Sequence, residues 1–429
     1  MSNCEKKELT LKVIFVCFLF FPSMSFAYDI NSYIQKVLSV SNEIKKYEED
    51  LEISKKEYAS SLLSLYFPEI YYTLKNTPYS DSQKKIEIKD KNFESVLSLN
   101  YNLFNNFKDK ISKDASYLAM KLVEDNLWLK KQELAYDAME LFCSALKNEK
   151  LLEVMKANEK SYEEEYIRSQ QYYKTGLRSY SDLLKSELNY KNAMLSTLFY
   201  ENNYKNAIMS LSYKIYEDPL TELSLVPIKD ISFPQLPELE KAVDIALANR
   251  REIKTYQTMM ELKMKEYKKK KIALWPDLKA DFSYSDYEIF SLGPSVSAPS
   301  YYLKLSLSFP LGHSFYDRHK EALEYKYYLN RAGRDLFALK LQIKKEVAEN
   351  ARAYRYALKK YDVSRTNVEI SGSNLEIIKT KYAQGNISII DFIEAQKDDL
   401  QAKSNMAESF YDLYLAYYAY KKSIGEQLW

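Results

Sequence analysis

Short stretches of this sequence alternate between apolar and polar residues, as strands with one apolar face do. The clearest stretch lies in the second half of the chain, where Leu278, Phe282 and Tyr284 alternate with polar residues such as Lys279 and Asp281. The alternation predicts two pairs of strands, one over residues 68–76 and 94–104 and the other over residues 276–286 and 300–310.

A much longer stretch with helical spacing follows each strand pair. Over residues 106–174, and again over residues 314–384, apolar side chains recur three or four positions apart, which predicts one amphipathic helix in each stretch. Neither stretch contains a proline, which in a helix interior would cost about 3 kcal/mol. At about 1.5 Å per residue, each helix would be roughly 100 Å long. A shorter helix is predicted before each strand pair, over residues 29–66 and 238–274.

The two halves of the chain repeat each other. Three residues near the end of the first long helix match three near the end of the second at a constant offset of 209 residues: Tyr173 with Tyr382, Gly176 with Gly385, and Asp182 with Asp391. An internal repeat of this length has to be recognised before the fold can be predicted. It predicts a first unit over residues 28–216, a proline-rich linker over residues 217–237 and a second unit over residues 238–429.

The matched glycines mark the points where we expect the long helices to end. A glycine adopts the left-handed conformation that closes many helices, so the chain would turn back at Gly176 and at Gly385. Ser179 or Ser181 would then cap the returning helix in the first unit, and Ser388 would cap it in the second. Each unit would therefore end in a helical hairpin whose tip lies about 100 Å from the strands.

The first 27 residues are typical of a secretory signal peptide. They combine basic residues at the start, an apolar run from Val13 to Phe21 and a small-residue cleavage site that ends at Ala27. The mature chain is expected to begin near Tyr28, outside the cytoplasm. Cys143 would be its one cysteine, which excludes a disulfide within the mature chain.

Composition and motifs give no support for an enzyme or a nucleic-acid-binding protein. The 62 basic and 60 acidic residues nearly cancel, so no excess of positive charge favours nucleic acid. The sequence has no glycine-rich phosphate loop and no metalloprotease or serine-hydrolase motif. The two histidines, His313 and His319, are six residues apart and are interpreted as structural, so we expect no catalytic residue, metal or cofactor.

Four strands with one polar face raise the question of how their edges are covered. Such a sheet cannot close on itself, and open edges in lipid would leave backbone groups without hydrogen bonds. Three chains could pool twelve strands into a closed barrel with the polar face inward. A soluble pair of hairpins packed on a helical bundle is the alternative.

The ordered set of segments resembles the TolC-type outer-membrane efflux and secretion channels. The resemblance is carried by "LYFPEI" and "LWPDL", which open the strand pairs, by "FPLG" after the last strand, and by the tyrosine–glycine–aspartate tips. It implies a mainly α-helical fold with transmembrane β-strands, made from a duplicated helix–strand–strand–helix–helix unit. Three chains would form a twelve-stranded barrel in the outer membrane and a twelve-helix tunnel in the periplasm.

The resemblance also implies a function and partners. The protein would be a passive exit duct in a tripartite efflux or type I secretion system, working with a periplasmic adaptor and an inner-membrane pump of the RND, ABC or MFS class. The hairpin tips would contact the adaptor through Tyr173, Gly176, Leu177, Gly385 and Ile387. A periplasmic coiled-coil adaptor or scaffold without a barrel is the competing interpretation.

A gate at the tunnel entrance is part of the same expectation. Asp391 and Glu394 lie three residues apart on one helix face, and in the family acids at these positions form rings around the constriction. The family also bonds a tyrosine at the position of Tyr382 to an aspartate at the position of Asp182.

Two positions depart from the family pattern. Ile387 replaces the family arginine, for which Arg178 is a candidate substitute, and Lys185 stands in the first tip where the second has Glu394. A solvated helix face is the alternative interpretation of the two acids.

Overall fold

The computed structural model describes residues 27–77, 91–221, 223–228, 232–290, 296–297, 299–384 and 386–429. Residues 1–26 of the expected signal peptide and the second tip glycine, Gly385, lie outside the described residues. In each of the two units, two helices precede the strands and two helices follow them: α1 (Ile30–Val40), α2 (Asn42–Tyr66), β1 (Glu69–Thr77), β2 (Lys91–Phe104), α3 (Lys108–Lys174), α4 (Tyr180–Lys214), α5 (Leu239–Asn249), α6 (Arg251–Ile272), β3 (Asp277–Phe290), β4 (Val296–Ser297), β5 (Ser300–Ser308), α7 (His313–Ala383) and α8 (Ile389–Ser423).

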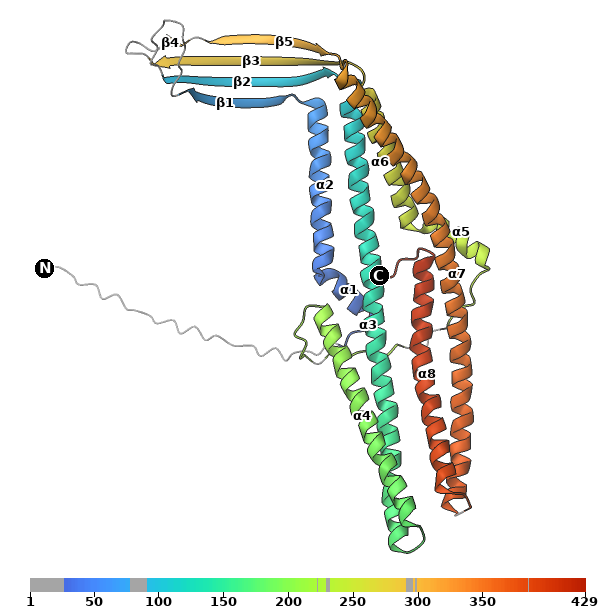
Figure 1. Ribbon diagram of the computed structural model, residues 1–429. Helices are drawn as coiled ribbons and strands as arrows, with labels where there is room; N and C mark the ends of the chain where they lie inside the picture. The colour runs from blue at the N-terminus through green and yellow to red at the C-terminus, as the bar shows by residue number, and fades with distance from the viewer. Residues whose placement is uncertain are drawn as a thin grey trace, which may run out of the picture.

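All the strands form one antiparallel sheet at one end of the molecule (Figure 1). The strands β1, β2 and β3 pair in sequence, and β4 and β5 pair with successive parts of β3. The register places apolar residues directly beside one another across the sheet, as in the row Ile70, Leu99, Phe282 and Leu303. The alternation in the sequence therefore builds one continuous apolar face, and β1 and β5 form the two edges of the described sheet.

Two long helices connect the sheet to the opposite end of the molecule. Figure 1 shows α3 and α7 running from the sheet towards the hairpin tips. Near the sheet the packing order is α2, α3, α6, α7, and beyond the middle it is α4, α3, α8, α7. In both layers α3 lies inside and α7 lies at one edge. Within the described part of the chain, none of the helices has an apolar stretch long enough to cross a membrane.

The helix predicted over residues 29–66 is in fact two helices, which corrects the sequence-based expectation. The chain leaves the helical conformation at Ser41, where φ is −60° and ψ is 121°. The hydroxyl of Ser41 accepts a hydrogen bond from the amide of Ile44, which caps the start of α2. The break turns α1 away from the direction of α2 and lets it pack on α3.

The second unit breaks at the equivalent place, so the helix predicted over residues 238–274 is also two. Arg250 separates α5 from α6 and has φ −63° and ψ 123°. Its guanidinium is bound by the carboxylates of Glu252 and Glu346. Gly425 packs against the break, where a Cβ atom would lie 3.0 Å from the backbone of Asn249 and Arg250. The C-terminal segment therefore needs both the break and a glycine.

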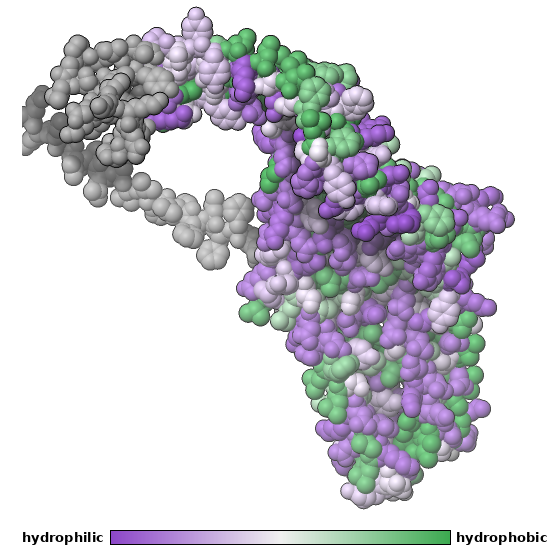
Figure 2. Space-filling view, turned by 45° about the horizontal axis from the view of Figure 1, so that its top comes forward, coloured by the Kyte–Doolittle hydropathy of each residue, from purple (hydrophilic) through white to green (hydrophobic). Residues whose placement is uncertain are grey.

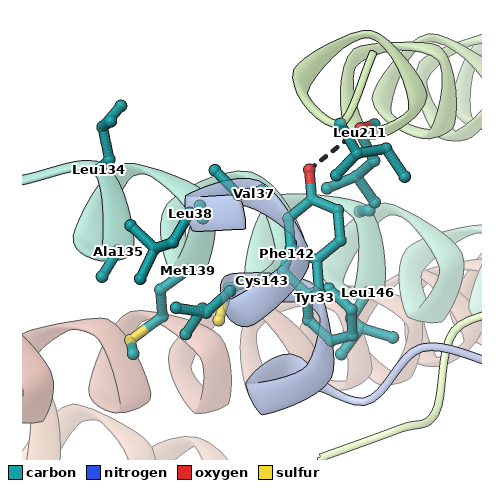
Figure 3. Packing of buried hydrophobic residues seen from close by; sticks show 14 of the residues in the cluster. Tyr33, Val37, Leu38, Leu134, Ala135, Met139, Phe142, Cys143, Leu146 and Leu211 are labelled. Atoms are coloured by element: carbon teal, nitrogen blue, oxygen red, sulfur yellow. Dashed lines mark hydrogen bonds between the residues drawn. The ribbon is translucent and has the colours of Figure 1, made fainter. Parts of the chain in front are cut away.

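The main hydrophobic core lies in the middle of the molecule, where α1 packs on α3 (Figure 3). Tyr33 and Phe142 are fully buried there with ring centroids 5.5 Å apart. The Tyr33 hydroxyl donates a 3.1 Å hydrogen bond to the carbonyl of Leu211 at the end of α4. Cys143 is buried in the same cluster, and burial raises its pKa to about 12. This core anchors the first unit, from which the α3–α4 hairpin extends.

Candidate functional site: the hairpin tips and the open edges

The first hairpin turns at Gly176. Its φ is +76°, in the left-handed region, and no atom lies within 4 Å of the place where a Cβ would be built. The amide of Leu177 reaches back to the carbonyl of Tyr172 at 2.9 Å, which satisfies a carbonyl in the last turn of α3. Backbone conformation, and not crowding, is therefore the reason for glycine at this position.

The returning helices begin with two equivalent capping boxes. The hydroxyl of Ser179 donates to Asp182 at 2.8 Å, and the hydroxyl of Ser388 donates to Asp391 at 2.8 Å. In each box the serine oxygen also accepts the amide of the aspartate. Both tip aspartates therefore hold the first turn of a helix, which explains their equivalent positions in the two units.

Tyr382 makes a different hydrogen bond from the one that the resemblance implies. Its hydroxyl donates to Oε1 of Glu165 at 2.7 Å, and both side chains are buried. Asp182 is instead engaged by Ser179 in its own capping box. The bond between Tyr382 and Glu165 joins the α7–α8 hairpin to the α3–α4 hairpin within one chain, two helical turns or more from the first tip.

Aromatic and charged groups surround this bond. The ring of Phe392 stacks on Tyr382 with centroids 4.7 Å apart, and the guanidinium of Arg178 lies 4.3 Å from the centre of the tyrosine ring. Arg168 lies 3.8 Å from the other oxygen of Glu165. Burial, followed by the hydrogen bond to Glu165, raises the pKa of Tyr382 above its usual range. We call Glu165, Arg168, Arg178, Tyr382 and Phe392 the Tyr382 cluster.

A second contact between the hairpins lies farther from the tips. The amide of Gln396 on α8 donates to the hydroxyl of Ser161 on α3 at 3.0 Å. Gln396 is buried, and its carbonyl oxygen has no hydrogen-bond partner within the described structure. This contact and the Tyr382 cluster show that polar groups hold the two hairpins together near the tips.

The other predicted site residues lie at the surface. Asp391 and Glu394 are both exposed at the start of α8, and Glu394 has no ion pair among the described residues. Leu177 is 72% exposed at the first tip, Tyr173 is also exposed, and Ile387 is half-buried. Within one chain the two acids are thus exposed, whereas Tyr382 and Glu165 are buried, and the apolar side chains of Tyr173 and Leu177 face solvent.

The long sides of the molecule carry further exposed apolar side chains. On the outer side of α7, exposed apolar residues recur every seven positions: Tyr356, Val363, Ile370 and Ile377. On α4 a similar exposed series runs along the helix: Leu184, Leu188, Leu195, Leu198, Phe199 and Met209. A repeat of seven is the spacing by which one helix packs along another.

The sheet has an open apolar face as well. Its side chains on β1 and β5 are more than half exposed, including Ile70, Tyr72, Leu303 and Leu305. Figure 2 shows the hydrophobic colour gathered along the sheet and hydrophilic side chains over the helices beneath it. The opposite face carries a row of polar residues that pair across the strands: Glu69, Asn100, Asp281 and Lys304. The described residues contain no group of histidine, cysteine and acidic side chains that could hold a metal ion.

The architecture defines the class of fold: it is that of the TolC-type outer-membrane channels, with duplicated strand pairs and paired helical hairpins. Among solved structures, the CmeC outer membrane channel of Campylobacter jejuni superposes with a TM-score of 0.80 at 14% sequence identity, over 92% of this chain and 85% of that one. The MtrE outer membrane channel of Neisseria gonorrhoeae, solved in an open state, gives 0.78 at 14% identity, over 93% and 89%. The outer membrane protein VceC of Vibrio cholerae gives 0.75 at 12% identity, over 93% and 97%. No family model and no curated protein sequence matches this chain.

Proposed function

We propose that this protein is a passive exit duct of the outer membrane and that three copies form one channel. The observation that carries the proposal is the pair of open edges on a chain with the fold of known outer-membrane channels. One edge is formed by β1, α2 and α4, and the other by β5 and α7. Because the two edges differ, copies would join head to tail and close into a ring.

The sheet supports closure in the membrane. Each chain supplies β1, β2, β3 and the β4–β5 strand, so three chains would give twelve strands, an even number within the range of membrane barrels. Closure would pair β1 of one chain with β5 of the next and would satisfy the edge groups that lipid cannot. The apolar rows would face lipid, and the row from Glu69 to Lys304 would line the water-filled interior.

The helical edges support the same head-to-tail contact. The exposed series on α4 would pack along the seven-residue series on α7 of the next chain. This contact covers apolar surface that a single chain leaves in water, and burial of apolar area stabilises by roughly 25 cal/mol per Å². The helices would then continue the barrel as a tunnel through the periplasm.

The tips would form the entrance of that tunnel. We propose that the Tyr382 cluster holds the two hairpins of each chain together in a closed state. Asp391 and Glu394 of three chains would place six carboxylates around the narrowest point. Tyr173, Gly176, Leu177, Gly385 and Ile387 would form the docking surface for a periplasmic adaptor, which in turn would couple the duct to an inner-membrane pump.

Mass measurement of the full chain in mild detergent tests the proposal. The protein should measure as three chains and should form ion-conducting channels in planar lipid bilayers. Ile370→Glu, which puts a charge into the α7 series, should reduce the trimer fraction, whereas Ile245→Glu on α5, also exposed, should not. A stable monomer that inserts into membranes would refute the ring, and a protein that stays soluble without detergent would favour a periplasmic scaffold.

A further inference from the structure

Three lysines at the end of α6 have no acidic partner within the described structure. Lys268, Lys269 and Lys271 are exposed, while Lys270 beside them pairs with Glu321 at 2.8 Å. The other lysines of this helix end, Lys263 and Lys265, are also paired. In the segment "KEYKKKK", Lys265 and Lys270 are thus paired with acids, whereas Lys268, Lys269 and Lys271 have no described ion pair.

Hydrogen bonding at the helix end leaves the ammonium groups of these lysines free. Cations favour the C-terminal end of a helix because they interact with its free carbonyls. Arg318 donates to the carbonyl of Ala273 at 2.6 Å, and within the described structure none of the three lysine side chains makes a hydrogen bond to a carbonyl of the helix end. The lysine ammonium groups are therefore available to a partner outside the described chain.

An exposed tryptophan places the lysines relative to the sheet. Trp275 is 65% exposed and lies between the end of α6 and the start of β3. Lys268 and Lys271 are three residues apart on one face of α6, and Trp275 follows three residues after the last residue of that helix. The next residues in the chain enter the apolar face of the sheet through Leu278. Free cations, an exposed indole and the first residue of an apolar sheet face thus follow one another along the chain, where α6 meets the sheet.

We infer that Lys268, Lys269 and Lys271, with Trp275, bind the headgroups of anionic phospholipids at the periplasmic surface of the outer membrane. The inference rests on the proposed function, because it takes the apolar face of the sheet as the lipid-facing face. Tryptophan concentrates at the level of lipid headgroups, where its ring is apolar and its N–H is hydrated. Lysine stems extend along apolar surface and place their charge among phosphates. The surface therefore anchors the barrel at a fixed depth and prefers anionic over zwitterionic lipid.

Native mass spectrometry of the full-length protein in mild detergent tests the inference. Phosphatidylglycerol or phosphatidylcholine with the same acyl chains is added, and the lipids retained by each assembly are counted. The parent should retain phosphatidylglycerol preferentially. Each lysine near an anionic lipid surface contributes about 1 kcal/mol, which is roughly a five-fold change in affinity. Lys268→Gln with Lys271→Gln should therefore lower phosphatidylglycerol affinity at least five-fold, and Lys268→Arg with Lys271→Arg should retain it.

A matched control distinguishes the effect of charge at this surface from the effect of the total charge of the protein. Lys45→Gln with Lys46→Gln removes the same charge from exposed, unpaired positions at the end of α2 that is far from the sheet, and should leave lipid retention unchanged. Equal retention of both lipids by the parent, or equal losses in both double variants, would overturn the inference. So would displacement of the lipid by millimolar inorganic phosphate, which would assign the lysines to a free anion. A protein that retains no lipid and fails to insert into vesicles would instead contradict the proposed function.

Discussion

The hydroxyl of Tyr382 donates a 2.7 Å hydrogen bond to the carboxylate of Glu165, and this bond joins the two helical hairpins of the chain. Both groups are buried, so water cannot replace the bond without first entering the junction. Arg178, over the tyrosine ring, contributes a positive charge from the first hairpin tip. Separation of the hairpins would break all of these contacts together.

Removal of the Tyr382 hydroxyl should make the channel open more readily. Hydrogen bonds to charged groups contribute about 1.5–3 kcal/mol, and a buried Glu165 without its donor would further destabilise the closed arrangement. Tyr382→Phe should therefore raise the open probability in planar-bilayer recordings about ten-fold or more. Tyr162→Phe is the matched control, since Tyr162 is also buried on α3 and its hydroxyl makes no hydrogen bond in the described structure. Equal gating in the two variants would show that the cluster does not control the entrance.

Gly176 and Gly333 should respond in opposite directions to alanine. Gly176 has positive φ, so Gly176→Ala should cost about 1 kcal/mol locally. Gly333 lies inside α7 with open space around it, so Gly333→Ala should stabilise the helix by up to about 1 kcal/mol. Hydrogen exchange provides the measurement. The amide of Leu177, bonded to Tyr172, should exchange about five-fold faster in the first variant only; unchanged exchange would mean that the turn tolerates a side chain.

Much of the fold could be predicted from the sequence because its signals are local and repeated. Period-two alternation and the long stretches without proline are properties of neighbouring residues, and the fold class that they predict is confirmed. The breaks at Ser41 and Arg250 could not be predicted in the same way. Ser41 caps the helix that follows, but serine is common inside helices, and the break at Arg250 depends on contacts with Glu346 and Gly425, which are distant in sequence.

In the candidate site, too, the contacts between residues distant in sequence could not be predicted. The family resemblance pairs Tyr382 with Asp182, but nothing in the sequence singles out Glu165, which lies within a long helix rich in glutamate. Only the structure shows which acid of that helix accepts the hydrogen bond from the tyrosine at the end of α7. Arg178 could be proposed as a substitute for the missing family arginine, yet its position over a ring required the structure.

Alkaline pH should destabilise the helical part of the protein. Burial raises the pKa of Tyr354 to about 12, and its hydroxyl donates to the carbonyl of Pro234 at 2.7 Å. An unfolded tyrosine loses its proton near pH 10. Between about pH 10 and about pH 12 the unfolded chain therefore binds fewer protons than the folded one, and stability falls as pH rises.

Thermal unfolding midpoints across this range, with tyrosinate absorbance recorded in parallel, check that expectation. Tyr354→Phe should lower the midpoint at neutral pH through loss of about 1 kcal/mol of hydrogen bonding. It should also flatten the alkaline decline, because one group with a raised pKa has been removed. A decline of equal steepness in the parent and the variant would contradict the assignment to Tyr354.

The acids at the second tip should make the closed entrance cation-selective. Asp391 and Glu394 are exposed on one face of α8, and three chains would bring six carboxylates together. At 0.1 M salt the Debye length is about 10 Å, so charges gathered around a constriction of that size attract cations jointly. Multivalent cations added on the periplasmic side should therefore block the channel. Asp391→Asn with Glu394→Gln should weaken both selectivity and block, and asparagine retains a side-chain oxygen that can accept the hydrogen bond from the Ser388 hydroxyl. Asp182→Asn is the control: it changes the equivalent capping box of the first tip, where Lys185 replaces the second acid.

Single-channel reversal potentials under a salt gradient measure the selectivity. If the double variant retains the selectivity and block of the parent, the two acids form a solvated helix face and the constriction lies elsewhere along the tunnel.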